Sequence, residues 1–339
     1  MDWVKTLSRT LIAAVAALAG PAAAQTAVRF SLDSRYEGPT APFLVALDRG
    51  YFKAEGLEVS ISASAGLAEP VTRVASGLYD MSVGDINALI RFRDGNQAAP
   101  LKAVFMVYDR PPFAVIGRRS RQIAVPKDLE GKTLGAPAAD PAFAQWPVFA
   151  RANAIDPAKV AVETVGFAVR EPMLAAGQVD AITGLSFASF VNLKERGVPL
   201  GDIVMMLMAD YGVELYGDAV IVNPAFVAEK PEAVKGFLRA LTRGLKDTAK
   251  NPAAAIESVL KRSDGAKKDV ELERLAMALR DNIVTPAVKA SGLGGVDMER
   301  LDRAIDQIAA ARGFARDKPK AADIFDDSFL PPAAERAVN

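Results

Sequence analysis

The sequence predicts an α/β protein of two similar lobes, each a mostly parallel sheet with helices on both faces, joined by two hinge crossings. Short apolar strand patterns alternate with helix patterns along both halves of the chain, which is typical of parallel sheets covered by helices. The segments 74–84 and 174–184 share Ala, Gly, Asp and Gly at matching positions. Gly77 and Gly177 each stand where a helix ends before a buried strand.

The context of this repeat is also repeated, so each half follows the order strand, helix, strand, helix, strand. The predicted strands before the two repeats are residues 27–32, 57–63, 132–136 and 160–165, and the predicted helices are 42–49 and 143–153. The chain length suits two domains, since it exceeds the usual size of one.

Two segments are predicted to cross between the lobes, at residues 108–113 and 216–222. Lobe one is therefore expected to comprise residues 25–110 and 221–339, and lobe two residues 111–220. From Pro224 onward the pattern is helical, and we expect these helices to pack on lobe one and the hinge: 230–250, 252–262, 269–281 and 297–311.

The first 24 residues have the order of a secretory signal peptide. Lys5 and Arg9 precede an apolar run at 11–20, and small residues end at Ala24. We expect cleavage after Ala24 and a periplasmic mature chain. No later stretch approaches the roughly 20 apolar residues of a membrane helix, so no direct membrane insertion is expected.

The composition excludes several classes of function. Lys and Arg total 41, as do Asp and Glu, so no basic excess favours nucleic acid. The chain has neither Cys nor His, which rules out Cys nucleophiles, Ser-His-Asp triads and zinc sites built from these side chains. We expect no cofactor, no metal and no catalysis, although carboxylate, Lys and Tyr chemistry stays open.

A binding site is predicted at the carboxyl ends of the parallel strands, where ligands of open α/β sheets bind. The loops there carry aromatic groups and several carboxylates. The candidate ligand-binding residues are Arg35, Tyr36, Glu37, Gly66, Asp85, Asn87, Asp140, Trp146, Phe167, Ser186, Phe187, Asp210 and Tyr211. Three residues of these loops also have a structural interpretation in place of ligand binding. Asp33 and Asp140 can cap turns or helices, and Trp146 can belong to the core.

The segment 46–59, ALDRGYFKAEGLEV, resembles the signature of nitrate, alkanesulfonate, taurine and thiamine-pyrimidine binding proteins of ABC importers. Further matches follow at 129–135 and 231–234, and the resemblance extends from about residue 28 to about residue 260. It implies the type II periplasmic binding protein fold, a small-molecule ligand between the lobes, an inner-membrane ABC permease as partner, and a monomer.

Within that family, residues 210–213 and 165–167 are most similar to the thiamine-pyrimidine branch, whereas loop 34–39 lacks its Trp, Asn and His. Sulfonate or nitrate would need clustered cations, and the loops offer only Arg35 and Arg170. We therefore expect a heteroaromatic or amine-bearing ligand, with Asp85 and Asp210 as acceptors. The alternatives are a sulfonate, nitrate or aromatic carboxylate binder, a periplasmic sensor, or an enzyme resembling pyrimidine synthase.

Overall fold

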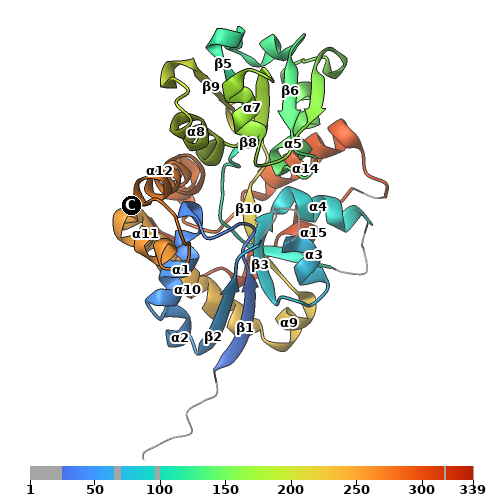
Figure 1. Ribbon diagram of the computed structural model, residues 1–339. Coiled ribbons are helices and arrows are strands. Elements are labelled where there is room, and N and C mark those ends of the chain that lie inside the picture. Colours follow the sequence, from blue (N-terminus) through green and yellow to red (C-terminus); the bar gives the residue numbers. More distant parts are fainter. Residues whose placement is uncertain (1–24, 65–69, 96–99, 317, 339) are drawn as a thin grey trace, which may run out of the picture.

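The computed structural model describes residues 25–64, 70–95, 100–316 and 318–338. Within these ranges the strands form two separate five-stranded sheets (Figure 1). Sheet one has the order β2-β1-β3-β10-β4, with β1 (Thr26–Ser31), β2 (Leu57–Ser62), β3 (Met81–Asp85), β4 (Lys102–Met106) and β10 (Asp218–Val222). Sheet two has the order β7-β6-β8-β5-β9, with β5 (Phe113–Arg118), β6 (Thr133–Ala136), β7 (Ala161–Thr164), β8 (Ala181–Leu185) and β9 (Ile203–Leu207).

The two sheets have the same plan. In each, the first three strands of the order run parallel and the fourth strand is antiparallel to both neighbours: β10 in sheet one and β5 in sheet two. The chain enters β5 directly from sheet one and β10 directly from sheet two, and each of these strands runs antiparallel to its neighbours. The predicted fold of two similar, mostly parallel lobes is confirmed. We use lobe one and lobe two for sheet one and sheet two with the helices that cover them.

Helices cover the faces of both sheets (Figure 1). Those between strands are α1 (Ala41–Asp48), α2 (Tyr51–Ala54), α3 (Pro70–Ala75), α4 (Ile86–Gly95), α5 (Pro141–Ala144), α6 (Trp146–Ala152), α7 (Arg170–Ala176) and α8 (Ser186–Glu195). After β10 follow α9 (Pro224–Glu229), α10 (Pro231–Lys250), α11 (Pro252–Leu260), α12 (Lys268–Ala278), α13 (Pro286–Ser291), α14 (Met298–Arg312), α15 (Ala321–Ile324) and α16 (Ala333–Arg336).

Two predicted helices differ in detail from the observed ones. The segment 143–153 is divided between α5 and α6, because Pro147 opens α6 and has no backbone N–H to continue a helix from before it. The segment 269–281 is α12 followed by a π-helical turn, η7 (Leu279–Ile283). Element type was therefore correct in both places, and only the boundaries differ.

Aromatic packing anchors the core of lobe one. Phe30 of β1 stacks on Phe43 of α1 and on Phe237 of α10, with ring centroids 5.2 and 4.9 Å apart. All three side chains are at most 2% exposed. Burial of such side chains contributes roughly 1.5–3 kcal/mol each, so these contacts hold α1 and α10 on sheet one and fix the loop that joins β1 to α1.

The two crossing segments lie side by side. Gly217 donates its N–H to the Tyr108 carbonyl at 3.0 Å, and a Cβ at position 217 would lie only 2.8 Å from the Tyr108 Cβ. Arg300 of α14 binds both segments: it donates to the Asp109 carboxylate at 3.0 Å and lies 3.9 Å from the centre of the Tyr216 ring. This packing places Tyr108 and the start of β10 between the two sheets.

The C-terminal helices reach both lobes. Helices α10 and α11 pack on α1, whereas α12 packs on α11 and on α8 of lobe two, and α14 packs on α6 of lobe two. They therefore extend beyond lobe one and the hinge, where the sequence pattern had placed them. In the part of the chain described, no helix combines the length and the apolar character that crossing a membrane requires.

Candidate functional site

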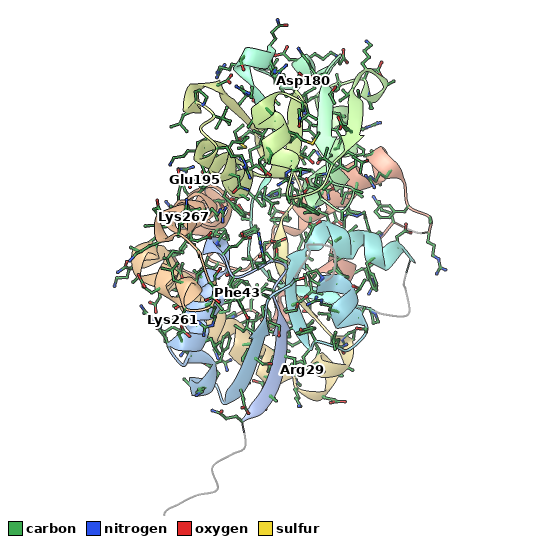
Figure 2. All side chains as sticks on the ribbon, viewed as in Figure 1. Arg29, Phe43, Asp180, Glu195, Lys261 and Lys267 are labelled. Carbon is green, nitrogen blue, oxygen red and sulfur yellow. The ribbon has the colours of Figure 1, made fainter. Side chains whose placement is uncertain are left out.

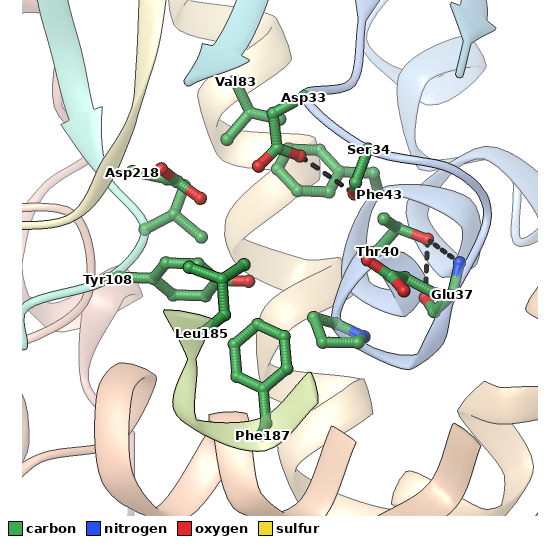
Figure 3. A pocket seen from close by; sticks show the side chains of 12 residues that line it. Asp33, Ser34, Glu37, Thr40, Phe43, Val83, Tyr108, Leu185, Phe187 and Asp218 are labelled. Atoms are coloured by element: carbon green, nitrogen blue, oxygen red, sulfur yellow. Dashed lines mark hydrogen bonds between the residues drawn. The ribbon is translucent and has the colours of Figure 1, made fainter. Parts of the chain in front are cut away.

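A small cavity lies between the two sheets (Figure 3). Both lobes contribute to its wall. Its lining residues are Asp33, Ser34, Glu37, Pro39, Thr40, Phe43, Val83, Val107, Tyr108, Leu185, Phe187 and Asp218. The wall includes the carboxyl-end loop of β1 and the last residue of β8, which agrees with the general position of ligand sites in α/β sheets.

Two carboxyl groups meet at the lobe-one side of the cavity. Asp33 follows β1, and Asp218 begins β10 directly opposite Asp85 of β3. Burial raises the pKa of Asp33, and a hydrogen bond with Asp218 partly opposes this shift. Burial also raises the pKa of Asp218 well above its usual range, and the negative charges of Asp33 and Asp85 raise it further. Both carboxyl groups therefore hold a proton more tightly than an exposed aspartate does.

Asp85 lies behind this pair and has partners of its own. Its Oδ1 accepts hydrogen bonds from the backbone N–H of Asn87 at 2.9 Å and from the Asn87 side-chain amide at 2.6 Å. The Arg91 guanidinium lies 3.5 Å from the other oxygen. Asn87 also donates to the Tyr216 carbonyl at 2.7 Å. Asp85 and Asn87 thus connect the start of α4 to a crossing segment.

Glu37 occupies the opposite side of the cavity, before the short helix η1 (Gly38–Thr40). Burial raises its pKa to about 7, although Arg274 lies 3.9 Å away and acts in the other direction. Arg274 is also bound to Glu271 and donates to Asn192 of α8 at 2.7 Å. Glu271 in turn accepts the N–H of Gly38 at 2.6 Å. This network ties the cavity wall to α12 and to lobe two.

Aromatic rings form the remaining wall. The rings of Tyr108 and Phe187 meet edge to face, with centroids 6.3 Å apart and an angle of 62°. Tyr108 is 6% exposed and Phe187 is 2% exposed. In the view of Figure 3 the Tyr108 hydroxyl points into the cavity, and it has no hydrogen-bond partner among the described residues. Phe187 comes from the first turn of α8, so lobe two closes the cavity with an apolar ring.

Lobe two contains a buried charge cluster in which every charge has a partner. Arg170 donates to Asp140 at 3.2 Å and to Glu171 at 2.8 Å. Thr183 donates to Asp140 at 2.7 Å, and Ser189 donates to Glu171 at 2.8 Å. Asp140 also accepts the N–H of Ala142 as the N-cap of α5. We call these residues the lobe-two cluster: Asp140, Arg170, Glu171, Thr183 and Ser189.

The structure places Glu37 and Phe187 in the cavity wall, and Asp85 and Asn87 directly behind it. Ser186, beside Phe187, is buried and donates its backbone N–H to the Pro112 carbonyl at 2.7 Å. These five predicted residues therefore come together from lobe one and lobe two.

Other predicted residues of the first loop and of lobe two lie elsewhere. Arg35 is exposed, and the Tyr36 hydroxyl donates to the Ile61 carbonyl at 3.1 Å. Phe167 is 44% exposed beneath the Arg170 guanidinium. Asp140 is held in the lobe-two cluster. Gly66 lies outside the described residues.

The last three predicted residues lie near α6 and the second crossing. Trp146 packs against Phe149, with ring centroids 6.0 Å apart, and is 5% exposed. Tyr211 meets the same Phe149 edge to face at 6.2 Å. Asp210 is 58% exposed and forms an ion pair with Arg110. None of these three lines the cavity described above.

Sequence reasoning did not select five polar residues that line the cavity: Asp33, Ser34, Thr40, Tyr108 and Asp218. A cap is the structural alternative for Asp33, and Tyr108 and Asp218 lie in predicted hinge crossings. A usable signal existed, since a crossing segment that enters a sheet beside the carboxyl ends of parallel strands must pass the ligand site. The polar residues of both crossings were therefore candidates.

Comparisons with known proteins place this architecture among binding proteins and their relatives. Residues 39–255 match the family described as NMT1/THI5 like. The riboflavin-binding protein RibY of Chloroflexus aurantiacus is 29% identical over 221 residues, which cover 64% of this chain and 61% of that protein. The formylaminopyrimidine-binding protein of Halalkalibacterium halodurans is 28% identical over 276 residues, 78% of this chain and 79% of that protein.

More distant similarities extend to an enzyme and to a solved structure. The 4-amino-5-hydroxymethyl-2-methylpyrimidine phosphate synthase of Legionella pneumophila is 25% identical over 222 residues, covering 64% of this chain and 67% of the enzyme. The periplasmic aliphatic sulphonate binding protein SsuA of Escherichia coli superposes with a TM-score of 0.70 at 13% identity, covering 90% of this chain and 99% of SsuA. The latter shows a shared fold.

Proposed function

Because the chain belongs to the NMT1/THI5-like family, we propose that it is the solute-binding component of an ABC importer, which captures a small molecule between its lobes. The observation that carries this proposal is the cavity whose wall joins lobe one to Leu185 and Phe187 of lobe two. A site of this kind is completed only when the lobes close, which is how a hinged binding protein couples ligand capture to a change of shape.

We propose a heteroaromatic solute of the thiamine-pyrimidine type. The Tyr108 and Phe187 rings offer flat apolar contact, and two relatives are named as binding riboflavin and formylaminopyrimidine. A sulfonate or nitrate would face Asp33, Glu37 and Asp218 in the wall. Carboxylates repel such anions, and Arg35 is not among the lining residues, so an anionic ligand is disfavoured.

The proposed role is not catalytic. The synthase relatives raise the alternative of an enzyme, and this chain has no His and no Cys with which to support catalysis by those side chains. Incubating the protein with a bound pyrimidine and following the ligand by mass spectrometry tests this point. An unchanged ligand mass is expected, and a stoichiometric or repeated conversion would favour the enzyme.

We propose a periplasmic monomer that delivers its ligand to an inner-membrane permease. Residues 1–24, which carry the predicted signal, lie outside the described residues. The predicted division into 25–110 with 221–339 and 111–220 stays a proposal, with hinges near 109–113 and 216–220, although β10 of sheet one begins at Asp218. Intact mass of the periplasmic fraction tests cleavage after Ala24, and a mature chain that retains residues 1–24 would contradict export.

The ligand test starts from protein purified without refolding. Native mass spectrometry should show a co-purified aromatic metabolite, and a thermal-shift screen should rank pyrimidines and riboflavin above sulfonates, nitrate and aromatic carboxylates. Leu200→Ala, on an exposed side chain outside the cavity, provides a matched control for cavity variants. Stabilisation by sulfonates or nitrate alone would contradict the proposed solute class.

A further inference from the structure

Helix α8 of lobe two contacts both the cavity and the C-terminal helices. Its first turn carries Phe187, which lines the cavity, and its second half packs on α12. Figure 1 shows α8 and α12 side by side at one edge of the molecule. Because a short helix moves as one rigid element, the position of Phe187 over the cavity depends on how α8 packs on α12.

Helix α12 is attached to lobe one at the cavity wall. The Gly38 N–H, in η1, donates to the Glu271 carboxylate of α12 at 2.6 Å. The two backbones are so close that a Cβ at position 38 would collide with the Glu271 carbonyl oxygen. Helix α12 also packs on α11, which packs on α1. Helix α12 therefore belongs to lobe one, and its contact with α8 is a contact between the lobes.

Arg274 of α12 interacts with groups on both sides of this contact. Its guanidinium pairs with Glu271 and lies 3.9 Å from the Glu37 carboxylate in the cavity wall. It also donates to the side-chain oxygen of Asn192 on α8 at 2.7 Å. The Arg274 side chain is only 16% exposed, so salt screens these interactions weakly. Of these three interactions, only the one with Asn192 joins the two lobes.

Two ion pairs between the same helices lie at the exposed edge of the contact. Lys194 of α8 donates to Glu273 of α12 at 2.7 Å, and Lys267 at the start of α12 donates to Glu195 of α8 at 3.1 Å. Figure 2 shows Glu195 and Lys267 at this edge. These four side chains are between 32% and 70% exposed. Exposed pairs contribute little and are screened by salt, whereas a better-buried hydrogen bond from a charged donor contributes more.

On the premise of the solute-binding function above, we propose that Arg274 is a positioning residue. Its bond to Asn192 holds α8 against α12, and so favours the closed arrangement in which Phe187 covers the cavity. Arg274 does not line the cavity, so it acts through α8. Loss of the bond should let lobe two rotate away about the hinge while both lobes stay folded. The quantity that changes is the ratio of closed to open molecules, which is measurable without a ligand.

The experiment measures the distance between two spin labels on the full mature chain by pulsed electron paramagnetic resonance. The chain has no Cys, so Leu200→Cys and Asp264→Cys give one labelled position on each lobe. Both residues are exposed and lie outside the cavity. The ligand-free protein should show a peak at the distance of this structure, and a longer distance for open molecules.

Two substitutions of similar size at position 192 separate the hydrogen bond from packing. Asn192→Leu removes the acceptor but leaves Arg274 its lobe-one partners, and the closed-to-open ratio should fall about tenfold. Asn192→Asp keeps an oxygen at that place and should retain the closed peak. Arg274→Met should lower the ratio at least as far as Asn192→Leu does. High salt should change the wild-type ratio by no more than about twofold, because it screens the edge pairs alone.

Arg118→Met is the matched control. The Arg118 side chain is 18% exposed, much like that of Arg274, and its bonds to Asp202 and to the Ala175 carbonyl stay within lobe two. This variant should lose stability without any change in the interlobe distances. If Arg274 had only a structural role, Arg274→Met would behave in the same way.

Several outcomes would overturn this proposal. They are a wild type without the closed peak, an unchanged ratio in Asn192→Leu, loss of the closed peak in Asn192→Asp, equal opening in Arg118→Met, and loss of the closed peak at high salt. The last result would assign closure to the edge pairs instead. If circular dichroism shows that Arg274→Met does not fold, Asn192→Leu decides, since Asn192 is only partly buried.

Failure of the proposed function is distinguishable from failure of this proposal. The absence of any co-purified metabolite, together with no stabilisation by any aromatic solute, would remove the solute-binding function. The distance measurement uses no ligand, so its result stands on its own. Binding of an aromatic solute with equal interlobe distances in wild type and Asn192→Leu would keep the function and remove the role of Arg274.

Discussion

Lobe one and lobe two share one sheet plan but treat charge in opposite ways. At the cleft end of sheet one, Asp85 of β3 faces Asp218 of β10; at the matching place in sheet two, Leu185 of β8 faces Phe113 of β5. Like charges placed directly opposite in neighbouring strands destabilise a sheet, whereas apolar pairs stabilise it. In sheet one, the charge of Asp85 helps to raise the pKa of Asp218, which favours the neutral form of that group.

The lobe-two cluster sharpens this contrast. Its two carboxylates, Asp140 and Glu171, share Arg170 and accept hydroxyl hydrogen bonds, so its charge is compensated within the lobe. Asp33 accepts a hydrogen bond from the Ser34 hydroxyl at 3.1 Å, but burial still raises the pKa values of both Asp33 and Asp218. The carboxyl groups of the cavity wall therefore come from lobe one, whereas lobe two contributes the apolar side chains of Leu185 and Phe187.

The largest effect is expected from breaking the compensation in lobe two. Arg170→Met leaves two buried carboxylates without their cation, which should lower the free energy of unfolding by about 3–5 kcal/mol. Urea denaturation followed by circular dichroism measures this change. Arg35→Met removes an exposed guanidinium and should shift stability by less than about 0.5 kcal/mol. A decrease of less than about 1 kcal/mol in the free energy of unfolding of Arg170→Met would show that Arg170 does not compensate the charges of Asp140 and Glu171.

A pH-dependent effect is expected from Glu37 in the cavity wall. The pKa of Glu37 in the folded protein is about 7, above its ordinary value of 4.5. Because the folded state holds this proton more tightly, its contribution to stability is fully present below about pH 4.5 and is lost as the pH rises through about 7.

Glu37→Gln should remove this contribution. Between those pH values the wild type should lose roughly 3 kcal/mol more stability than the variant. Asp33 and Asp218 are present in both proteins, so subtracting the two pH profiles isolates Glu37. Urea denaturation at several pH values gives the profiles, and parallel profiles would contradict the assignment of this group.

A smaller effect is expected where the apolar ring of lobe two meets lobe one. Phe187→Leu keeps an apolar side chain but removes the edge-to-face contact with Tyr108. Such contacts contribute about 0.5–1.5 kcal/mol beyond burial, so the affinity for an aromatic ligand should fall by up to about tenfold. Calorimetry measures this loss. Leu200→Ala is the control, and equal losses in both variants would indicate a general destabilisation.

The smallest effect is expected at the outer contact between the lobes. Lys194 of α8 donates to both carboxylate oxygens of Glu273 on α12, at 2.8 and 2.7 Å, and both groups are partly exposed. Exposed ion pairs contribute little and are screened by salt. Lys194→Met should therefore weaken ligand binding no more than about threefold, and the difference should vanish at high salt. A salt-independent loss would point to packing instead.

Much of the fold was predictable because its signals are local. Alternating strand and helix patterns, the repeat at 74–84 and 174–184, and the motif at 46–59 are each read within short windows of sequence. Pro147 showed why boundaries are harder: the helix pattern spans it, yet its missing N–H separates α5 from α6. The position of α14 on α6 of lobe two had no local signal at all.

The candidate site was likewise predictable from the sequence only in part. The sequence by itself determined that the chain is α/β and two-lobed, that it has no His or Cys, and that aromatic groups and carboxylates stand at strand ends. It could not distinguish a carboxylate that caps a helix from one that faces a cavity, because Asp33 and Asp140 have the same local appearance.

Only the tertiary structure decided which charges are compensated. Asp140 meets Arg170, whereas Asp33 meets Asp218, and each pair joins residues far apart in the chain. A carboxylate's pKa depends on its burial and on the charges within a few ångströms, and those neighbours are set by how strands cross between lobes. The chemistry of the cleft is therefore a property of the folded arrangement of the two sheets.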